Sequence, residues 1–197
     1  MAKERARILF DRYGILFREL LDNELEPLRW SRLFPVLRLM ELSGEIMSGY
    51  FFEGIPGVQF ISFEAFRLLS NGLDEEAIYW MNAKDPASLC GIGLEGLKGK
   101  LPRRIPSNHL VFQGRNVVLE SMKNGRELRI HIPPDHPRFH ESLGLFKILL
   151  SRGFNPMKGI VIETINGVAA ELSEYRAALR EFGFISGYNR LELRRRY

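Results

Sequence analysis

Apolar and polar residues alternate at helical spacing through the first third of the chain. Apolar residues recur every three or four positions over 3–12, 15–23 and 28–43, and each run predicts a helix. Two β-favouring runs separated by a Gly- and Pro-containing turn follow within 44–62 and predict a hairpin. A further short helix is expected at 63–71. Three helices followed by a hairpin is the element order of a winged helix.

The helix expected at 28–43 has two different faces. At about 100° per residue, its apolar residues gather on one side: Trp30, Leu33, Val36, Leu37 and Met40. The other side carries Ser31, Arg32 and Arg38, together with Pro35. Pro35 is expected either to kink the helix or to lie in its first turn behind a Ser31 cap.

The polar side of this helix is a candidate nucleic-acid surface. In a winged helix the third helix can enter a major groove, where Ser31, Arg32 and Arg38 would contact the nucleic acid. The wing, 44–62, contains no Lys or Arg, so phosphate contact there would rely on Tyr50 or on backbone amides. The alternative interpretation is a winged helix that only packs against protein.

From Leu73 onward the pattern is that of strands. Strand 76–83 is followed by a long Gly- and Pro-rich loop. Turns expected at 114–116 and, from the Asn-Gly pair, at 123–125 divide the next apolar runs into a meander. The sequence therefore predicts an α+β fold with two parts. A winged-helix domain at 1–72 precedes a small β-barrel-like α+β module at 73–197, which comprises the strand meander 76–133 and an αβαβ end at 134–197.

Composition and charge narrow the class of protein. The chain has 197 residues, of which 45% are hydrophobic and 26% charged, as in an ordinary globular protein with a real core. Its net charge of +4, with the basic excess after residue 72, permits a polyanionic partner without requiring one. No apolar run approaches the ~18 residues of a membrane span, so no membrane partner is expected. The charged N-terminus and the single Cys90 predict a cytoplasmic location.

A second group of cations lies in the loop that follows strand 76–83. Lys98, Lys100, Arg103 and Arg104 fall within seven residues and could neutralise phosphates. The competing interpretation is a solvated loop whose charge only maintains solubility. The terminal run 194–196, three arginines, is interpreted mainly as a solvated tail.

Three further patterns in the sequence could carry chemistry. The glycines of 91–96 match G-x-G-x-x-G, but no helix opens at them, so no dinucleotide site is expected. His131, His136 and His140 are interpreted as a strand residue and helix-cap neighbours rather than metal ligands, and no metal is expected. Asp85 precedes Pro86 and is expected to start a turn. It is also the one candidate for activating a water in hydrolytic chemistry, although no partner base is apparent.

Several short motifs together resemble a known family. In order, they are Phe34-Pro35-Val36-Leu37, Met40-Glu41 with Gly44, Gly49-Tyr50-Phe51, Gly54 with Gly57, Gln59-Phe60 and Asp85-Pro86-Ala87. This series resembles the C-terminal region of Lhr-type (large helicase-related) superfamily-2 ATP-dependent helicases. The resemblance implies a parent with upstream motor domains that hold ATP and Mg, a series of winged helices, a closing β-barrel module, and unwinding of DNA or RNA–DNA hybrids in repair.

The resemblance also ranks the possible functions. The first is a non-catalytic nucleic-acid-binding accessory module of a DNA-repair helicase, without a cofactor of its own. Its expected partners are DNA or an RNA–DNA hybrid and the upstream helicase domains of the parent. The alternative is a protein-packing or oligomerisation module of the same helicase, which includes a possible homo-oligomer. A second alternative is a winged-helix domain like those of DNA glycosylases, with Asp85 as the best available carboxylate.

Overall fold

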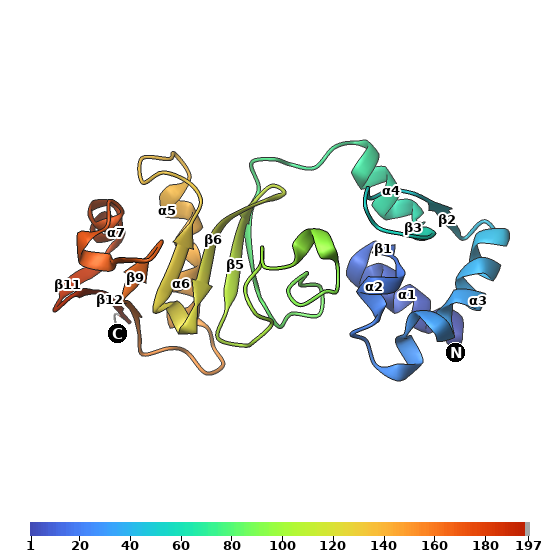
Figure 1. The fold of residues 1–197 in the computed structure, drawn as a ribbon, viewed down its shortest axis with the longest axis horizontal. Coiled ribbons are helices and arrows are strands. Elements are labelled where there is room, and N and C mark those ends of the chain that lie inside the picture. Colours follow the sequence, from blue (N-terminus) through green and yellow to red (C-terminus); the bar gives the residue numbers. More distant parts are fainter. Residues whose placement is uncertain (196–197) are drawn as a thin grey trace. The chain divides into compact units, whose positions relative to one another are not determined.

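The structure, a computed structural model, describes residues 1–195 and divides into two compact units (Figure 1). Unit 1 comprises Met1–Leu73 together with Leu89–Leu101, and unit 2 comprises Asp74–Ser88 and the chain from Pro102 onward. The boundary drawn from the sequence at 72/73 assigns 89–101 to the second module. In the structure this segment packs with unit 1, because Ile92 joins its buried core and Leu94 packs against that core.

Unit 1 has the helices and strands of a winged helix. In chain order they are α1 (Ala2–Tyr13), β1 (Ile15–Leu16), α2 (Arg18–Leu21), the 3-10 turn η1 (Glu26–Leu28), α3 (Trp30–Leu42), β2 (Ile46–Gly49), β3 (Gln59–Ser62) and α4 (Phe63–Ser70), with a further 3-10 turn, η2 (Glu95–Leu97). The expected helix at 15–23 is wrong in its first half. Ile15 and Leu16 instead pair with β3, so the sheet order is β1-β3-β2 and both side chains are buried.

The core of unit 1 fixes the orientation of α3. Leu33, Leu37 and Met40 are buried, as the apolar spacing predicts. The Trp30 ring lies 5.9 Å from the Phe60 ring on β3, measured between centroids. The helix begins at Trp30 after an Arg29 cap, so Ser31 is not the cap, and Pro35 lies inside the helix beyond its first turn. The opposite face of α3 is left to solvent.

One buried side chain shapes the wing between β2 and β3. Gln59 is fully buried. Its Oε1 accepts hydrogen bonds from the backbone N–H groups of Phe51 (3.0 Å) and Phe52 (2.9 Å). Its Nε2 donates to the carbonyls of Phe52 (3.0 Å) and Ile55 (3.4 Å). The wing backbone therefore forms these hydrogen bonds with a side chain instead of with a neighbouring strand.

Unit 2 has more strands. They and the accompanying helices are β4 (Ile78–Asn82), β5 (His109–Gln113), β6 (Asn116–Met122), the 3-10 turn η3 (Lys123–Gly125), β7 (Glu127–Ile130), α5 (Phe139–Ser142), α6 (Gly144–Ser151), β8 (Gly159–Ile162), β9 (Thr164–Ile165), β10 (Val168–Ala169), the 3-10 turn η4 (Ala170–Leu172), α7 (Arg176–Phe182), β11 (Ile185–Gly187) and β12 (Arg190–Arg194). None of the helices in residues 1–195 combines the length and apolar character needed to cross a bilayer.

The sheets of unit 2 are open, so the expected barrel-like module is wrong while the α+β class is confirmed. One sheet has the order β10-β9-β7-β6-β5-β4 and the other the order β11-β12-β8. Strand β9 pairs with β7 in parallel. A parallel pair needs a crossover, which α5, α6 and β8 provide here, so the chain returns beside β7 instead of closing the sheet onto β4. Figure 1 shows α5 and α6 behind strands β6 and β7.

A row of polar side chains crosses this sheet next to the core. The pairing register places Asn82, His109 and Ser121 side by side on β4, β5 and β6. His109 is 4% exposed, and its Nε2 lies 3.0 Å from the Asn82 amide nitrogen. Burial, reinforced by the charge of Arg152, lowers the pKa of His109 to about 4. His109 is therefore neutral in the folded protein at neutral pH.

Replacing Gln59 with Leu tests the account of the wing. The variant keeps the side-chain volume but leaves two backbone N–H groups without their acceptor, so we expect the free energy of unfolding of unit 1 to fall by about 2–3 kcal/mol. Urea unfolding followed by Trp30 fluorescence, in a Trp80→Phe background, measures it. Asn23→Leu, at an exposed site of unit 1 where the side-chain amide donates to the Gly91 carbonyl, is the control. Equal losses in both variants would contradict this account.

His109 predicts how the stability of unit 2 depends on pH. Above the unfolded pKa of about 6.5 the side chain is neutral in both states, and its contribution to stability is complete. As the pH falls toward the folded pKa of about 4, the unfolded chain binds a proton that the folded chain does not. The free energy of unfolding should then drop by about 3 kcal/mol. Thermal unfolding monitored at Trp80, in a Trp30→Phe background, should show this loss, and His109→Gln should flatten it. An unchanged pH slope in that variant would refute the assignment.

Candidate nucleic-acid interface

The outer face of α3 presents the side chains expected there from the sequence. Ser31, Arg32 and Arg38 are all exposed. Arg32 Nη2 pairs with Glu26 Oε1 at 2.6 Å, and Arg38 pairs with Glu41 one turn along the helix. The two arginine side chains are 67% and 48% exposed. Surface pairs of this kind contribute roughly 0–1 kcal/mol, so an incoming phosphate can replace either carboxylate.

The same face also carries exposed apolar side chains that the sequence interpretation missed. Leu39 is 61% and Leu42 is 78% exposed, and both follow Pro35 at helical spacing. The signal was present in the pattern, since both leucines fall away from Leu33 and Leu37 at 100° per residue. The outer face of α3 is therefore half cationic and half apolar.

The wing contributes one prominent side chain. Tyr50, which follows β2, is 84% exposed. It leaves the sheet just before the loop that Gln59 holds in place. A phenol in this position has a hydroxyl and a ring face that can meet a phosphate or a sugar.

The four cations of the 98–104 loop are divided between the units. Lys98 and Lys100 lie in the segment that packs with unit 1, while Arg103 and Arg104 belong to unit 2. Lys98 Nζ lies 3.6 Å from Glu95 Oε1. Arg104 donates from Nη1 to the carbonyl of Ser88 at 2.9 Å and from Nη2 to that of Asp85 at 3.0 Å. Arg104 thus holds the turn at 85–88, a structural role.

Asp85 has a role in that turn. Its Oδ1 accepts a hydrogen bond from the Ala87 N–H at 2.8 Å, and its own N–H donates to the Asn82 carbonyl at 2.9 Å. These bonds are those of an Asp-initiated turn, which the Asp-Pro pair predicts. Within residues 1–195, these hydrogen bonds join Asp85 to backbone groups of its own turn and not to a base or a nucleophile.

The three histidines considered as metal ligands have separate partners. His131 Nε2 lies 2.9 Å from the buried carboxylate Glu120, and His140 Nε2 lies 3.2 Å from the carbonyl of Ala178. The Nδ1 atom of His136 accepts from the Arg138 N–H at 3.2 Å. Within residues 1–195, no group of three or more His, Cys, Asp or Glu side chains is arranged to hold a metal ion.

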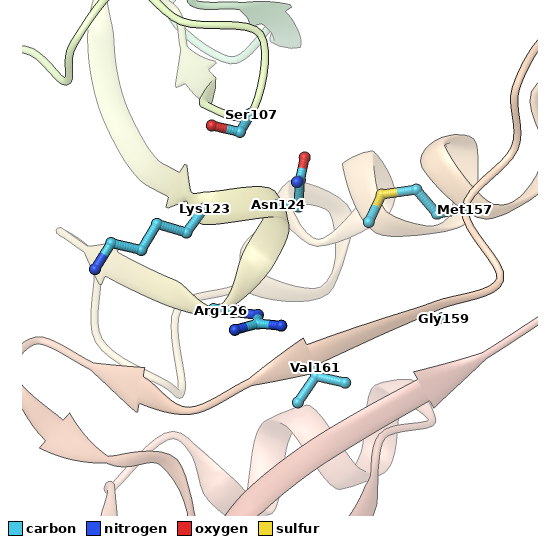
Figure 2. Close-up of a pocket in the computed structure, with 7 residues that line it drawn as sticks. All are labelled: Ser107, Lys123, Asn124, Arg126, Met157, Gly159 and Val161. Carbon is cyan, nitrogen blue, oxygen red and sulfur yellow. The ribbon is translucent and has the colours of Figure 1, made fainter.

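Unit 2 contains a cationic hollow that the sequence interpretation did not predict. Its volume is about 480 Å³, and it is lined by Ser107, Lys123, Asn124, Arg126, Met157, Gly159 and Val161. Figure 2 shows the Arg126 side chain below those of Ser107 and Asn124 and above Val161. Two cations and no carboxylate line this hollow. Two acids outside the lining pair with these cations: Glu127 with Lys123, and Glu163 with Arg126 at 3.7 Å.

The turn η3 forms one wall of this hollow in a fixed conformation. Lys123, Asn124 and Gly125 have φ of 52°, 60° and 92°, the left-handed region that only glycine adopts without cost. The Asn124 N–H donates to the Ser107 carbonyl at 2.8 Å, which holds the turn in place. A Cβ at Gly125 would lie 2.7 Å from Ile160 Cγ2. The sequence predicted this turn, but not the hollow beside it.

Comparison with known proteins agrees with this architecture. Residues 1–81 match the family model described as the winged-helix domain of large helicase-related protein. The chain is also 26% identical, over 190 residues, to the Lhr helicase/uracil glycosylase of Escherichia coli strain K12, an alignment that covers 92% of this chain and 12% of that protein. The chain therefore spans only a small part of the relative's length. Together these matches support an Lhr-type C-terminal region, with residues 1–81 similar to the family's winged-helix domain.

Proposed function

We propose that this chain is a nucleic-acid-binding accessory module of an Lhr-type helicase that acts in DNA repair. The observation that carries the proposal is the grouping of Ser31, Arg32 and Arg38 on the solvent-exposed face of α3. In winged helices this helix is the element that enters a major groove. The partner in this proposal is DNA or an RNA–DNA hybrid, and ATP and Mg belong to the motor domains of the parent.

The electrostatics of α3 suit such a partner. Glu26 and Glu41 each neutralise one arginine at the protein surface, where the pairs are exposed to water and salt. Binding to a phosphate exchanges a carboxylate for a phosphate oxygen and releases condensed counterions from the nucleic acid. Two charge-assisted contacts, with Ser31 and the exposed Tyr50 as neutral donors, would orient the helix without specifying a sequence.

The double variant Arg32→Ala, Arg38→Ala tests this function. We expect it to weaken binding to duplex DNA and to RNA–DNA hybrid, and to reduce the slope of log K against log salt by about 2, one for each lost phosphate contact. Fluorescence anisotropy between about 50 and 200 mM salt measures both. Arg18→Ala, Arg67→Ala removes the same charge from exposed positions of unit 1 outside α3. A salt-independent affinity, or an equal loss in both double variants, would exclude α3 as the binding element.

A second candidate function is protein packing, and the exposed leucines of α3 favour it. Pro35, Leu39 and Leu42 form an apolar strip beside the arginines, and exposed apolar strips commonly mark contacts with other protein surfaces. In this case the partner is either a second copy of the chain or an upstream domain of the helicase.

The variant Leu39→Ser, Leu42→Ser separates packing from nucleic-acid binding. If α3 packs against another copy, light scattering should show an oligomer for the natural chain and a monomer for the variant, with DNA affinity unchanged. Ile8→Ser, on α1 and 55% exposed, is the control for loss of an exposed apolar side chain. A natural chain that stays monomeric at high concentration would contradict self-association.

A further inference from the structure

Strands β8 and β12 turn one side of their sheet into the core and leave the other to solvent. Ile160 and Ile162 on β8, and Leu191 and Leu193 on β12, are the buried side chains. The register pairs Gly159 with Arg194 and Val161 with Glu192. Because paired residues share a face of an antiparallel sheet, these four lie on the outward side. Two of them are small, so the outward face has no bulky side chains along β8.

Three hollows are lined in part by these two strands, two along the outward side and a third toward α6, where the buried Leu193 lines it. The first is the cationic hollow beside η3, about 480 Å³ in volume. It shares Gly159 and Val161 with a second hollow of about 400 Å³. The second shares Leu193 and Arg194 with a third hollow of about 570 Å³, next to α6. Because neighbouring hollows share lining residues, we treat the three as one surface of unit 2, which we call the basic track.

The track is strongly cationic. The cations in its lining are Lys123, Arg126, Lys147, Lys158, Arg194 and Arg195. Glu192 is the one carboxylate in that lining, and it lies 2.7 Å from Arg190 and 3.0 Å from Arg194. The hydrogen bond from Arg194, with the added charge of Arg190, lowers the pKa of Glu192. Glu192 thus holds two arginines in place beside the other cations of the track.

Arg126 is the cation best placed for a phosphate. Its guanidinium is 3.7 Å from Glu163, beyond hydrogen-bonding distance, and its side chain is 63% exposed. A guanidinium can bind two phosphate oxygens at once. Ser107 and Asn124 border the same hollow and add neutral hydrogen-bonding groups (Figure 2).

We propose that unit 2 binds a single nucleic-acid strand along the basic track, with phosphates at Arg126 and Arg194. The inference rests on the proposed function and adds to it a second binding surface, separate from α3, and a preference for single strands. A single strand suits the track because its lining combines cations with the apolar side chains Met157, Val161 and Ile185, against which bases and sugars can pack. A helicase accessory module meets such a strand whenever a duplex is opened.

The test compares two double variants of the full chain with labelled single-stranded oligothymidylate. Arg126→Ala, Arg194→Ala should weaken binding about tenfold, at about threefold for each exposed contact, and reduce the salt slope by about 2. Arg126→Lys, Arg194→Lys keeps the charge and should retain most of the slope. If the alanine variant, with an unchanged melting curve, binds the strand as tightly and with the same salt slope as the natural chain, then the track is not what binds the strand, and the proposal is wrong.

Glu192→Gln provides the opposite change at the same site. It removes the track's carboxylate and releases Arg190 and Arg194, so single-strand binding should tighten about threefold. Glu64→Gln makes the same charge change on α4 of unit 1 and should have little effect. Equal tightening in both would show a net-charge effect without a site and would overturn the proposal.

The outcomes separate this inference from the function proposed for α3. If the Arg126 and Arg194 variant binds the strand normally while the Arg32 and Arg38 variant loses duplex binding, the basic track is refuted and the α3 function stands. If the track variant loses single-strand binding while the α3 variant keeps duplex binding, the track is supported and α3 is refuted. Failure of the natural chain to bind either probe refutes both.

Discussion

The packing of α3 against Phe60 determines which side chains of unit 1 can meet a partner. Leu33, Leu37 and Met40 must be buried, and the rings of Trp30 and Phe34 close over Phe60. Once that stripe is buried, the 3.6-residue period forces Arg32 and Arg38 outward on the opposite side. The same constraint exposes Leu39 and Leu42, so the outer face offers both a charged and an apolar means of contact. This packing therefore determines that a partner of unit 1 meets either the arginines or the leucines of α3.

The same principle operates in unit 2 with a period of two. Burial of alternate residues on β8 and β12 turns Gly159, Val161 and Arg194 outward. The strained turn η3 is fixed by the tight fit of Gly125 against Ile160, a residue of that same core face. The core of unit 2 therefore positions both η3 and β8, which line the first hollow. In each unit, burial of the apolar face leaves cations on the other.

Sequence patterns predicted the elements that depend on local spacing and missed those that depend on distant partners. The sequence predicted the two faces of α3, the hairpin wing and the turn at 123–125, because periodicity and turn chemistry act over a few residues. Strand β1 was missed because its partner β3 lies more than forty residues away. The open sheet was mistaken for a barrel because closure depends on which edges pair, and the parallel β7–β9 pair cannot be read locally. The basic track combines residues from 107 to 195, so no local motif marks it. The roles of Arg104 and Gln59 depend on backbone groups that only the folded loops bring within reach.

The faces that this packing leaves to solvent are the surfaces proposed to bind nucleic acid. The decisive experiment is amide hydrogen exchange of the full chain, measured at about 50 mM salt with and without saturating single-stranded or duplex DNA. The expected result is slowed exchange in α3 and the wing with duplex, and in η3, β8 and β12 with the single strand. Unchanged exchange in all of these segments, with either DNA in excess, would contradict the account.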